Sequence, residues 1–412
     1  MRALWAALTK RRGRGPARRS RGGIALLVVL TTVLVLTILV SELSYTSTVR
    51  LMVAAHSRDR AQAVWLARSG VNLYRLILTA NKQLEKSGIG ESLQEYTGIN
   101  IGDALWQLLP SINTGLLRML FSAGGDASDL EEEDVATFKQ TGKVSDAVAE
   151  ESRQGGLFDD KNFLDFDGDF SAEITDEESK INVNNLANRD TTQSIQLNAT
   201  ALQLYGRMSG EENDEWFREH NLDRWELIAN LADWVDQDNL RAAAQGGYED
   251  NLYNRLQSPY LTKNAPFDTK EEIRLVEGWQ DDVYDRFKDD LTIWGTGKIN
   301  INTASDEQIK GLIRAYVTPM PNDSTLELLV EQVRNQLMVV GSFKKGKEFT
   351  SFLEGLGYTV SGDLAQALSS SSYTFTLTST GLVGDSAATI TAVVDYGTKG
   401  GTVGKVLYWR ED

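Results

Sequence analysis

Residues 19–43 read RSRGGIALLVVLTTVLVLTILVSEL, and this stretch decides how the rest of the chain is interpreted. Two glycines, Gly22 and Gly23, join a basic leader to an apolar run over residues 24–40. A helix of this length spans roughly 25 Å, close to the lower limit for crossing a bilayer. A secretory signal would have a shorter apolar core and a small-x-small cleavage site, which the following VSELSYTS lacks. The stretch therefore predicts a retained membrane helix, which is either an uncleaved anchor or is cut at the glycines.

The helical pattern continues beyond the apolar run. Residues 45–80 contain no proline and a single glycine, Gly70. Apolar side chains recur there at a period close to 3.6 residues. They are Val64, Leu66, Leu73, Tyr74, Ile77 and Ala80. We expect one long helix over residues 24–80, apolar in its first half and amphipathic in its second.

A basic leader, a glycine and a long helix of this kind resemble the type IV prepilin-like proteins. The resemblance implies that prepilin peptidase cuts between Gly23 and Ile24 on the cytoplasmic face, and that the new amino terminus is methylated. Most pilins carry glutamate at the fifth mature position, where this chain has Val28. Loss of that glutamate together with a large head is similar to minor pseudopilin K of the type II secretion system, the GspK family. A generic minor type IV pilin is an alternative with the same kind of leader.

The distribution of charge predicts an orientation. Residues 1–23 hold eight of the 42 Lys and Arg residues and no acid, so the positive-inside rule places them in the cytoplasm. The rest of the chain holds 34 bases against 58 acids and is expected in the periplasm, behind a single span of the inner membrane. Such an acidic body would repel the phosphates of nucleic acid.

The residue types needed for most enzymatic sites are missing. The chain has no cysteine, which excludes disulfides, thiolate metal sites and a cysteine nucleophile. Its two histidines, His56 and His220, are placed on the helical stalk and at a helix end, where neither serves a nucleophile. We predict that the protein is not an enzyme. A carboxylate–metal hydrolase on a stalk is the enzymatic alternative, and it lacks a histidine-containing metal cluster.

The pattern along the chain predicts an α+β fold of the pilin-like kind. A long N-terminal helix packs on an antiparallel sheet, and a large all-helical domain is inserted between strands. The expected segments are a leader (1–23), the membrane half of the helix (24–43), its periplasmic half (44–83), an acidic connection (84–162), first strands (163–189), the inserted domain with SAM or helix-hairpin-helix character (190–368) and C-terminal strands (369–412).

One motif in the inserted block could indicate either nucleic-acid binding or internal packing. INTAS, residues 301–305, resembles the turn of helix-hairpin-helix modules that grip nucleic acid. Residues 296–320 hold only three bases, Lys298, Lys310 and Arg314, so we interpret the motif as a packing element. A membrane-tethered nucleic-acid receptor is the alternative.

The stretch DWVDQDNLRAAAQGGYEDNLY, residues 233–253, is a candidate cation site. Two of its acids lie three residues apart on a helix and share one face, and two more follow a glycine pair that allows a tight loop. A hard cation with six to eight oxygen ligands suits such a set. A solvated acidic helix end explains the residues equally well. The candidate ligands are Asp233, Asp236, Asp238, Glu249 and Asp250.

The resemblance to the K-type pseudopilins implies calcium in this loop, with more than one ion. It also implies partners: the I- and J-type minor pseudopilins through the N-terminal helix, prepilin peptidase and the inner membrane. The expected function is to form the tip of the pseudopilus and support export of folded proteins across the outer membrane. No nucleic acid is expected, and contact with the secreted proteins stays open, as does the role of the acidic segment 122–162. A second acidic stretch, DFDGDF (165–170), fails the EF-hand pattern because Phe170 stands where that loop needs glycine.

Overall fold

The computed structural model describes residues 22–87, 105–117, 166–188, 194–243, 246–339, 341–397 and 404–412. The chain divides into two compact units, Met1–Ala61 and Gln62–Asp412. Most of the predicted leader and the acidic segment 122–162 lie outside the described residues.

Helix α1 begins at Gly22 and ends at Ser87, so the expected long helix is present. In the unit Met1–Ala61 its apolar side chains are exposed. The hydroxyl groups of Thr31, Thr32 and Thr37 donate hydrogen bonds to carbonyl oxygens three or four residues earlier, which satisfies these polar groups within the helix. By length and composition, α1 could span a membrane.

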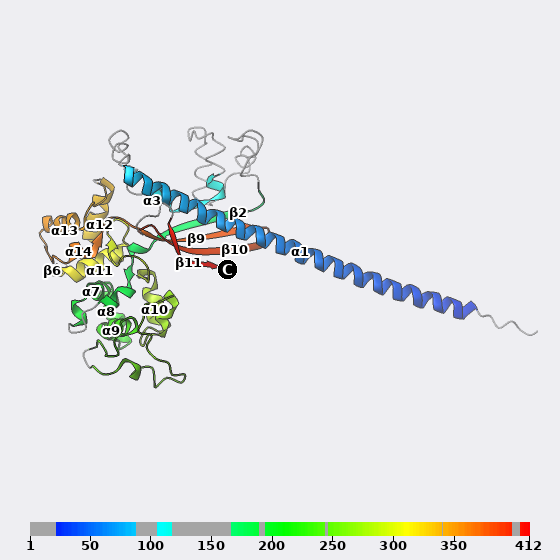
Figure 1. Ribbon diagram of the computed structural model, residues 1–412, viewed down its shortest axis with the longest axis horizontal. Coiled ribbons are helices and arrows are strands. Elements are labelled where there is room, and N and C mark those ends of the chain that lie inside the picture. Colours follow the sequence, from blue (N-terminus) through cyan, green and yellow to red (C-terminus); the bar gives the residue numbers. More distant parts are fainter. Residues whose placement is uncertain are drawn as a thin grey trace, which may run out of the picture. The chain divides into compact units, whose positions relative to one another are not determined.

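An antiparallel five-stranded sheet forms the centre of the unit Gln62–Asp412, with the strand order β1-β2-β9-β10-β11 (Figure 1). Short helix α3, Leu105–Leu108, precedes its first strand. Along the three longest strands, buried and more exposed residues mostly alternate as the period of two requires. The strands are β1 (Ser111–Asn113), β2 (Asp169–Asp176), β9 (Thr374–Val383), β10 (Ser386–Asp395) and β11 (Lys405–Glu411).

The part of α1 after Gln62 packs on one face of this sheet through small residues. A Cβ atom on Gly70 would lie 2.3 Å from Ser379 Oγ, and one on Gly381 of β9 would lie 2.0 Å from the carbonyl oxygen of Ala63. The Tyr74 hydroxyl donates a hydrogen bond to the carbonyl oxygen of Ala172 in β2, at 3.3 Å. Two glycines, one on each element, therefore set the close approach of helix and sheet.

This close approach corrects the predicted apolar stripe. Leu73, Ile77 and Ala80 are only half-buried, and Leu76 is exposed. The face against the sheet is rotated toward the small residues, because these allow a closer contact than branched side chains do. That face consists of Ala63, Leu66, Ala67, Gly70, Val71, Tyr74 and Leu78.

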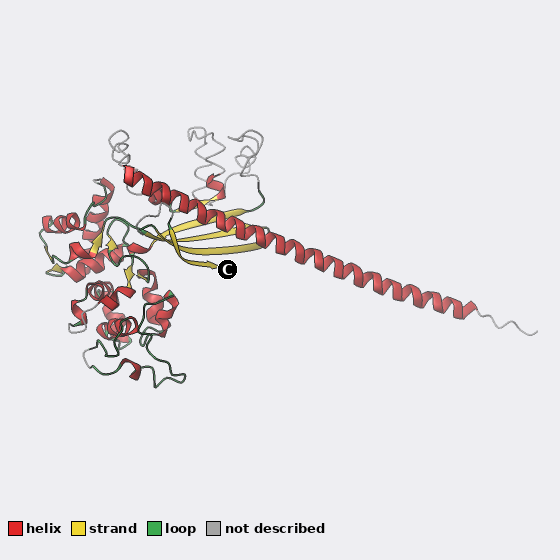
Figure 2. Cartoon of the chain, viewed as in Figure 1, coloured by secondary structure: helices red, strands yellow, loops and turns green. Residues whose placement is uncertain are grey.

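The long insertion between β2 and β9 is mostly helical (Figure 2). Its helices surround one large apolar core that is distinct from the core between α1 and the sheet. The α-helices are α7 (Ala199–Arg207), α8 (Glu211–Glu219), α9 (Arg224–Val235), α10 (Asp281–Phe287), α11 (Asp306–Tyr316), α12 (Asp323–Val339), α13 (Gly346–Gly355) and α14 (Leu364–Ala367). The 3₁₀ helices are η2 (Glu177–Ser179), η3 (Val183–Asn188), η4 (Ile195–Leu197), η5 (Glu249–Asn251), η6 (Lys270–Leu275) and η7 (Lys288–Asp290). Six two-residue strands complete it: β3 (Ile181–Asn182), β4 (Leu291–Thr292), β5 (Ile299–Asn300), β6 (Val317–Thr318), β7 (Thr359–Val360) and β8 (Leu368–Ser369).

The insertion contains the same structural unit twice. KINVNNLA (180–187) and KININTAS (298–305) each provide a short strand that pairs in parallel, β3 with β4 and β5 with β8. In the first copy the Asn184 side-chain amide exchanges hydrogen bonds with the backbone of Phe267, at 2.7 and 3.3 Å. In the second, Asn302 does the same with Phe343, at 2.9 and 3.0 Å. The INTAS turn is therefore the second copy of a packing element.

The two copies differ in one loop. In the first copy, residues 236–266 separate α9 from Phe267. In the second, only residues 340–342 separate α12 from Phe343. The candidate cation site lies in this additional loop.

Three consecutive acids join the insertion to the sheet. Asp176 Oδ2 accepts hydrogen bonds from the hydroxyls of Thr303 and Ser372, both at 2.5 Å, and so ties the end of β2 to the segment that leads into β9. Glu178 accepts one from the backbone N–H of Tyr373, also at 2.5 Å. Burial, together with the charge of Asp176, raises the pKa of Glu178 to about 7. Burial opposes the ionisation of Glu177, but Lys180 and two threonine hydroxyls outweigh it and lower the pKa of Glu177.

The α+β fold class with a helix on an antiparallel sheet is confirmed, while one local prediction is wrong. The second predicted strand of the 163–189 segment is only β3, which pairs with β4 in the insertion and not with the main sheet. Thr269 is the N-cap residue of the 3₁₀ helix η6, where the N–H of Asp268 donates a hydrogen bond to Glu272 at 2.9 Å and the Thr269 side chain makes no capping hydrogen bond. The predicted domain boundaries stay predictions.

Candidate metal centre

Helix α9 positions the first two carboxylates. Asp223 caps its N-terminus by accepting a hydrogen bond from the N–H of Glu226 at 3.0 Å, and apolar residues on several sides bury the helix in the core. Asp233 lies in its last turn and Asp236 is its C-cap, and they are 1% and 3% exposed. The helix therefore holds both side chains on one face, inside the protein.

A returning loop brings the third carboxylate to the same place. Leu240 and Tyr248 form an isolated antiparallel bridge, and Gly246 and Gly247 at the tip have positive φ angles of 62° and 110°. Such angles favour glycine, which explains the glycine pair. Glu249 follows at the start of η5 and is 1% exposed.

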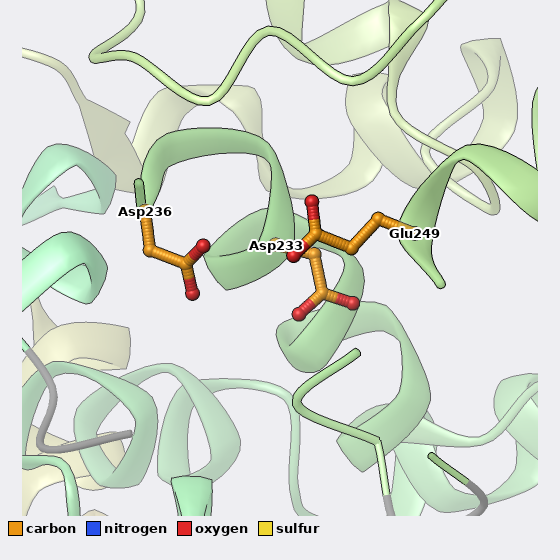
Figure 3. Close-up of side chains that lie close together, drawn as sticks. All are labelled: Asp233, Asp236 and Glu249. Carbon is orange, nitrogen blue, oxygen red and sulfur yellow. The ribbon is translucent and has the colours of Figure 1, made fainter. Parts of the chain in front are cut away.

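Asp233, Asp236 and Glu249 form one group, in which each residue offers an oxygen within 4.8 Å of the others. Figure 3 shows the Glu249 side chain extending from its own segment toward the two aspartates of α9. Oxygens bound to one calcium ion at about 2.3–2.6 Å lie no more than about 5 Å apart. The group therefore has the spacing that a single hard cation requires.

The other two predicted ligands lie elsewhere. Asp250 Oδ1 accepts hydrogen bonds from the N–H and the hydroxyl of Thr262, at 3.0 and 3.1 Å. Asp238 Oδ1 accepts one from the N–H of Leu240 at 2.7 Å, and its carbonyl oxygen accepts one from Asn264. Both residues are half-buried and neither belongs to the three-carboxylate group. The structure thus brings three of the five candidates together and uses the other two to shape the loop.

The residues of this group suit a hard cation. Three buried carboxylates repel one another and lose hydration, and a divalent cation offsets both effects. All three donors are oxygens, which favours calcium or magnesium. His220, which could favour a softer metal, instead stacks on Trp216 with ring centroids 4.2 Å apart.

Few residues of the loop are fully buried, although Ala242, Leu252, Leu256 and Tyr260 pack against the core while partly buried. Of the described residues between 237 and 266, only Glu249, Tyr253 and Thr262 are buried. Tyr253 packs against Trp234 at the end of α9, with ring centroids 5.5 Å apart. The N–H of Ala242 donates a hydrogen bond to Asp233 Oδ1 at 2.6 Å. A cation at the three carboxylates would link Glu249, in the middle of the loop, to the C-terminal end of α9.

The predicted N-terminal site residues lie at the start of α1. Gly23 is the second residue of the helix and Ile24 the third, and Val28 follows one turn later. Val28 is 53% exposed, and its carbonyl oxygen accepts the hydroxyl hydrogen of Thr32 at 2.7 Å.

Comparison with known proteins relates part of the chain to one protein family. Residues 179–296 match the family model for protein K of the type II secretion system. Over this span the chain is similar to the type II secretion system protein K family. The matched span contains all five predicted ligands and the first of the two repeated units.

Curated protein K sequences are similar to part of the chain. The protein from Klebsiella pneumoniae is 29% identical over 150 residues, which cover 36% of this chain and 44% of that protein. The protein from Pectobacterium carotovorum subsp. carotovorum is 27% identical over 173 residues, covering 40% of this chain and 50% of that protein. The chain therefore spans about half the length of the curated relatives it matches.

A solved structure is also similar. A chain of the GspK–GspI–GspJ complex from the enterotoxigenic Escherichia coli type 2 secretion system aligns with a TM-score of 0.39 and 19% identity. The alignment covers 60% of this chain and 80% of that chain.

Proposed function

We propose that the protein is a minor pseudopilin that forms the tip of the pseudopilus of a type II secretion system and supports export of folded proteins across the outer membrane. The observation that carries this proposal is the combination, in a chain that is similar to protein K over residues 179–296, of α1 with the large insertion between β2 and β9. An apolar helix serves to assemble subunits side by side. A head enlarged by an inserted domain suits the end of such an assembly better than its repeating shaft.

Val28 supports placement at the tip. In the prepilin-like proteins a glutamate at this position pairs with the terminal amine of a neighbouring subunit, and an unpaired glutamate in lipid is costly. A subunit at the tip has one neighbour fewer and can dispense with the charge.

The same proposal includes processing and orientation. Prepilin peptidase removes the leader between Gly23 and Ile24, and Ile24 is then methylated. The leader faces the cytoplasm, α1 crosses the inner membrane, and the remaining chain lies in the periplasm. The proposed partners are the I- and J-type minor pseudopilins, which contact the exposed side of α1.

Reconstitution with these partners tests the proposal. The full chain, co-expressed with the I- and J-type minor pseudopilins of the same organism, is expected to co-purify as a defined complex of the three. Deleting its gene is expected to abolish export of the secreted proteins. Purification of the chain alone as a long homopolymer would contradict a tip role, as would unchanged secretion in the deletion strain.

Introduction of the missing glutamate separates the tip from the shaft. Val28→Glu restores the residue with which shaft subunits dock, so we expect it to make the chain enter homopolymers more readily than Val29→Glu does. Equal behaviour of the two variants would show that Val28 has no part in the position of this subunit.

We further propose that Asp233, Asp236 and Glu249 bind calcium. The ion would supply only positive charge and coordination bonds, with no chemical step. Its role is to fix the additional loop of the first repeated unit, and backbone carbonyl oxygens of that loop could complete the ligand set. Two hypotheses of other classes, a nucleic-acid receptor and a metal hydrolase, lack an observation in their favour.

A further inference from the structure

A cleft with a volume of about 250 Å³ lies where the insertion meets the sheet, on the face opposite α1. Thr391 and Val393 of β10 line it, together with Tyr408 and Arg410 of β11. Register pairs Thr391 with Arg410 and Val393 with Tyr408, so these four side chains share one face of the sheet. Across the cleft stand residues of the insertion, including Lys270 and Trp294.

The cleft contains a cation without a counter-ion. Lys270 is half-buried and forms no hydrogen bond or ion pair with any residue that the structure describes. Of the other charges that line the cleft, Lys180 pairs with Glu177 at 2.8 Å and Asp268 with Lys263 at 2.8 Å, while Glu271 is exposed to solvent. Burial, together with the charge of Lys180, lowers the pKa of Lys270. An anion bound in the cleft would provide Lys270 with a counter-ion and would favour its charged form.

A second cation reaches the cleft from the sheet. Arg410 pairs with Asp412 at 2.8 Å, and the two side chains are about half exposed. Because an exposed pair of this kind contributes little stability, Arg410 can exchange that partner for a carboxylate in the cleft. Lys270, from the insertion, and Arg410, from the sheet, thus line the same cleft from opposite sides.

The strand that carries Arg410 is an unpaired edge. In the part of the chain that the structure describes, β11 pairs with β10 only. Asp412 exchanges both backbone hydrogen bonds with Thr389, at 2.9 and 3.2 Å. The alternation of an antiparallel ladder then directs the backbone groups of Trp409 and Glu411 outward. An extended segment could add to this edge by main-chain hydrogen bonds.

The side chains of such a segment would reach the cleft. Alternate residues of an added strand project to the same face as Tyr408 and Arg410. A residue opposite Arg410 would have its Cβ atom about 4.5–5.5 Å from that of Arg410, where opposite charges attract. Charge therefore selects glutamate or aspartate at this position of the segment.

The geometry points to a docking site: β11 and the cleft beside it bind an extended segment of another protein, which adds to the sheet edge and places an acidic side chain against Lys270 and Arg410. This inference does not depend on the proposed function, because it rests on the sheet edge and the charges of the cleft.

A synthetic peptide tests the site on the full chain in detergent. The probe is a ten-residue peptide of alternating threonine and valine, with lysines at its ends and one central glutamate on the cleft-facing register. Its match carries glutamine at that place. We expect the glutamate peptide to slow amide hydrogen exchange in residues 404–412, measured by mass spectrometry, and to bind roughly tenfold more tightly than the glutamine peptide.

Variants of Lys270 assign the effect to the cleft. Lys270→Gln is expected to reduce the preference for glutamate, with Arg410 still present, and to cause no further loss for the glutamine peptide, as coupling between the two groups requires. Lys270→Arg should retain it. The control is Lys347→Gln, an exposed lysine in the corresponding turn of the second repeated unit, which should behave as the unmodified protein.

Four results would overturn the proposal: no slowing of exchange by either peptide, equal affinity of the two peptides, an equal loss in Lys347→Gln, or the same effect from acetate alone. The last would show that the cleft takes a free carboxylate and that β11 plays no part. If Lys270→Gln unfolds, the comparison of the two peptides on the unmodified chain and on Lys270→Arg still decides.

Discussion

At the scale of single residues, the candidate metal centre predicts that calcium raises the free energy of unfolding. Three carboxylates less than 4% exposed lie together at the end of α9. Calcium at a hundredfold excess over its dissociation constant is expected to raise the free energy of unfolding of the full chain by about 2.7 kcal/mol. Thermal unfolding in detergent, with calcium and with a chelator, measures this.

Glu249→Gln removes one of the three charges and is expected to abolish the calcium-dependent rise. Glu226→Gln is the matched control, because Glu226 lies on α9, the helix that carries Asp233, while its side chain is 54% exposed and its ion pair with Arg241 is 3.4 Å long. Asp250→Asn should lower stability in chelator through its bonds to Thr262, yet retain the rise. The site would be refuted if calcium did not change the midpoint of thermal unfolding of the wild-type protein, or if it raised the midpoint of Glu249→Gln equally.

Glu178 predicts a dependence of stability on pH. Its pKa in the folded protein is about 7, against 4.5 ordinarily, mainly because of burial. A raised pKa means that the folded state holds the proton more tightly, so this contribution to stability is complete below about pH 4.5 and is lost as the pH rises through 7. We therefore expect Glu178→Gln to stabilise the protein at pH 8, by roughly 1–3 kcal/mol.

The comparison with wild type at pH 4.5 and pH 8 isolates this effect. Glutamine can still accept the hydrogen bond from the N–H of Tyr373, so the joint between insertion and sheet is retained. At pH 4.5, where the glutamic acid is neutral, the two proteins should differ little. A variant that is less stable than wild type at pH 8 would show that the charge of Glu178 strengthens the joint.

At the scale of elements, the contact between α1 and the sheet depends on glycine. A Cβ atom on Gly381 would meet the backbone of Ala63 and Ala67, which cannot move aside as a side chain can. Gly381→Ala is expected to cost about 1–3 kcal/mol or more, because overpacking strains both elements. Gly70→Ala meets first the Ser379 side chain, at 2.3 Å, and should cost less.

Gly355→Ala in α13 is the control for these substitutions. Nothing lies within 4 Å of the position that its Cβ would take, so we expect a neutral or slightly stabilising change. Thermal unfolding of the three variants ranks them. A cost in Gly381→Ala no larger than that in Gly355→Ala would mean that helix and sheet are farther apart than described here.

At the scale of the whole molecule, the absence of cysteine permits a direct test of orientation. Glu354→Cys places a thiol on the exposed side of α13. A maleimide that does not cross the inner membrane is expected to label it in cells with a permeabilised outer membrane. Ser20→Cys lies in the proposed leader and should not be labelled in such cells.

Intact mass of the purified protein then tests the processing step. Cleavage between Gly23 and Ile24 would remove the cysteine of Ser20→Cys altogether. Labelling of Glu354→Cys only after the inner membrane is broken would reverse the orientation. A mature protein that retains the leader would contradict the processing step alone.

Features that depend on neighbouring residues could be predicted from the amino-acid sequence. The length of α1, its apolar half, the α+β class and the acidic pair on α9 all follow from periodicity and composition, because each uses neighbouring residues. The segments KINVNNLA and KININTAS are also similar in sequence. The matching hydrogen bonds of Asn184 and Asn302 show that they form equivalent structural units.

Contacts between residues that lie far apart in the sequence could be identified from the three-dimensional structure but not from the sequence. The structure selected Glu249 over Asp250 as the partner of Asp233, because one residue of the returning loop faces inward while the next bonds to Thr262. It rotated the buried face of α1 toward Gly70, because the fit between two surfaces, and not the size of apolar side chains, sets the closest approach. It also placed Lys270 beside Arg410, 140 residues apart in the sequence, because the insertion folds back against the edge of the sheet.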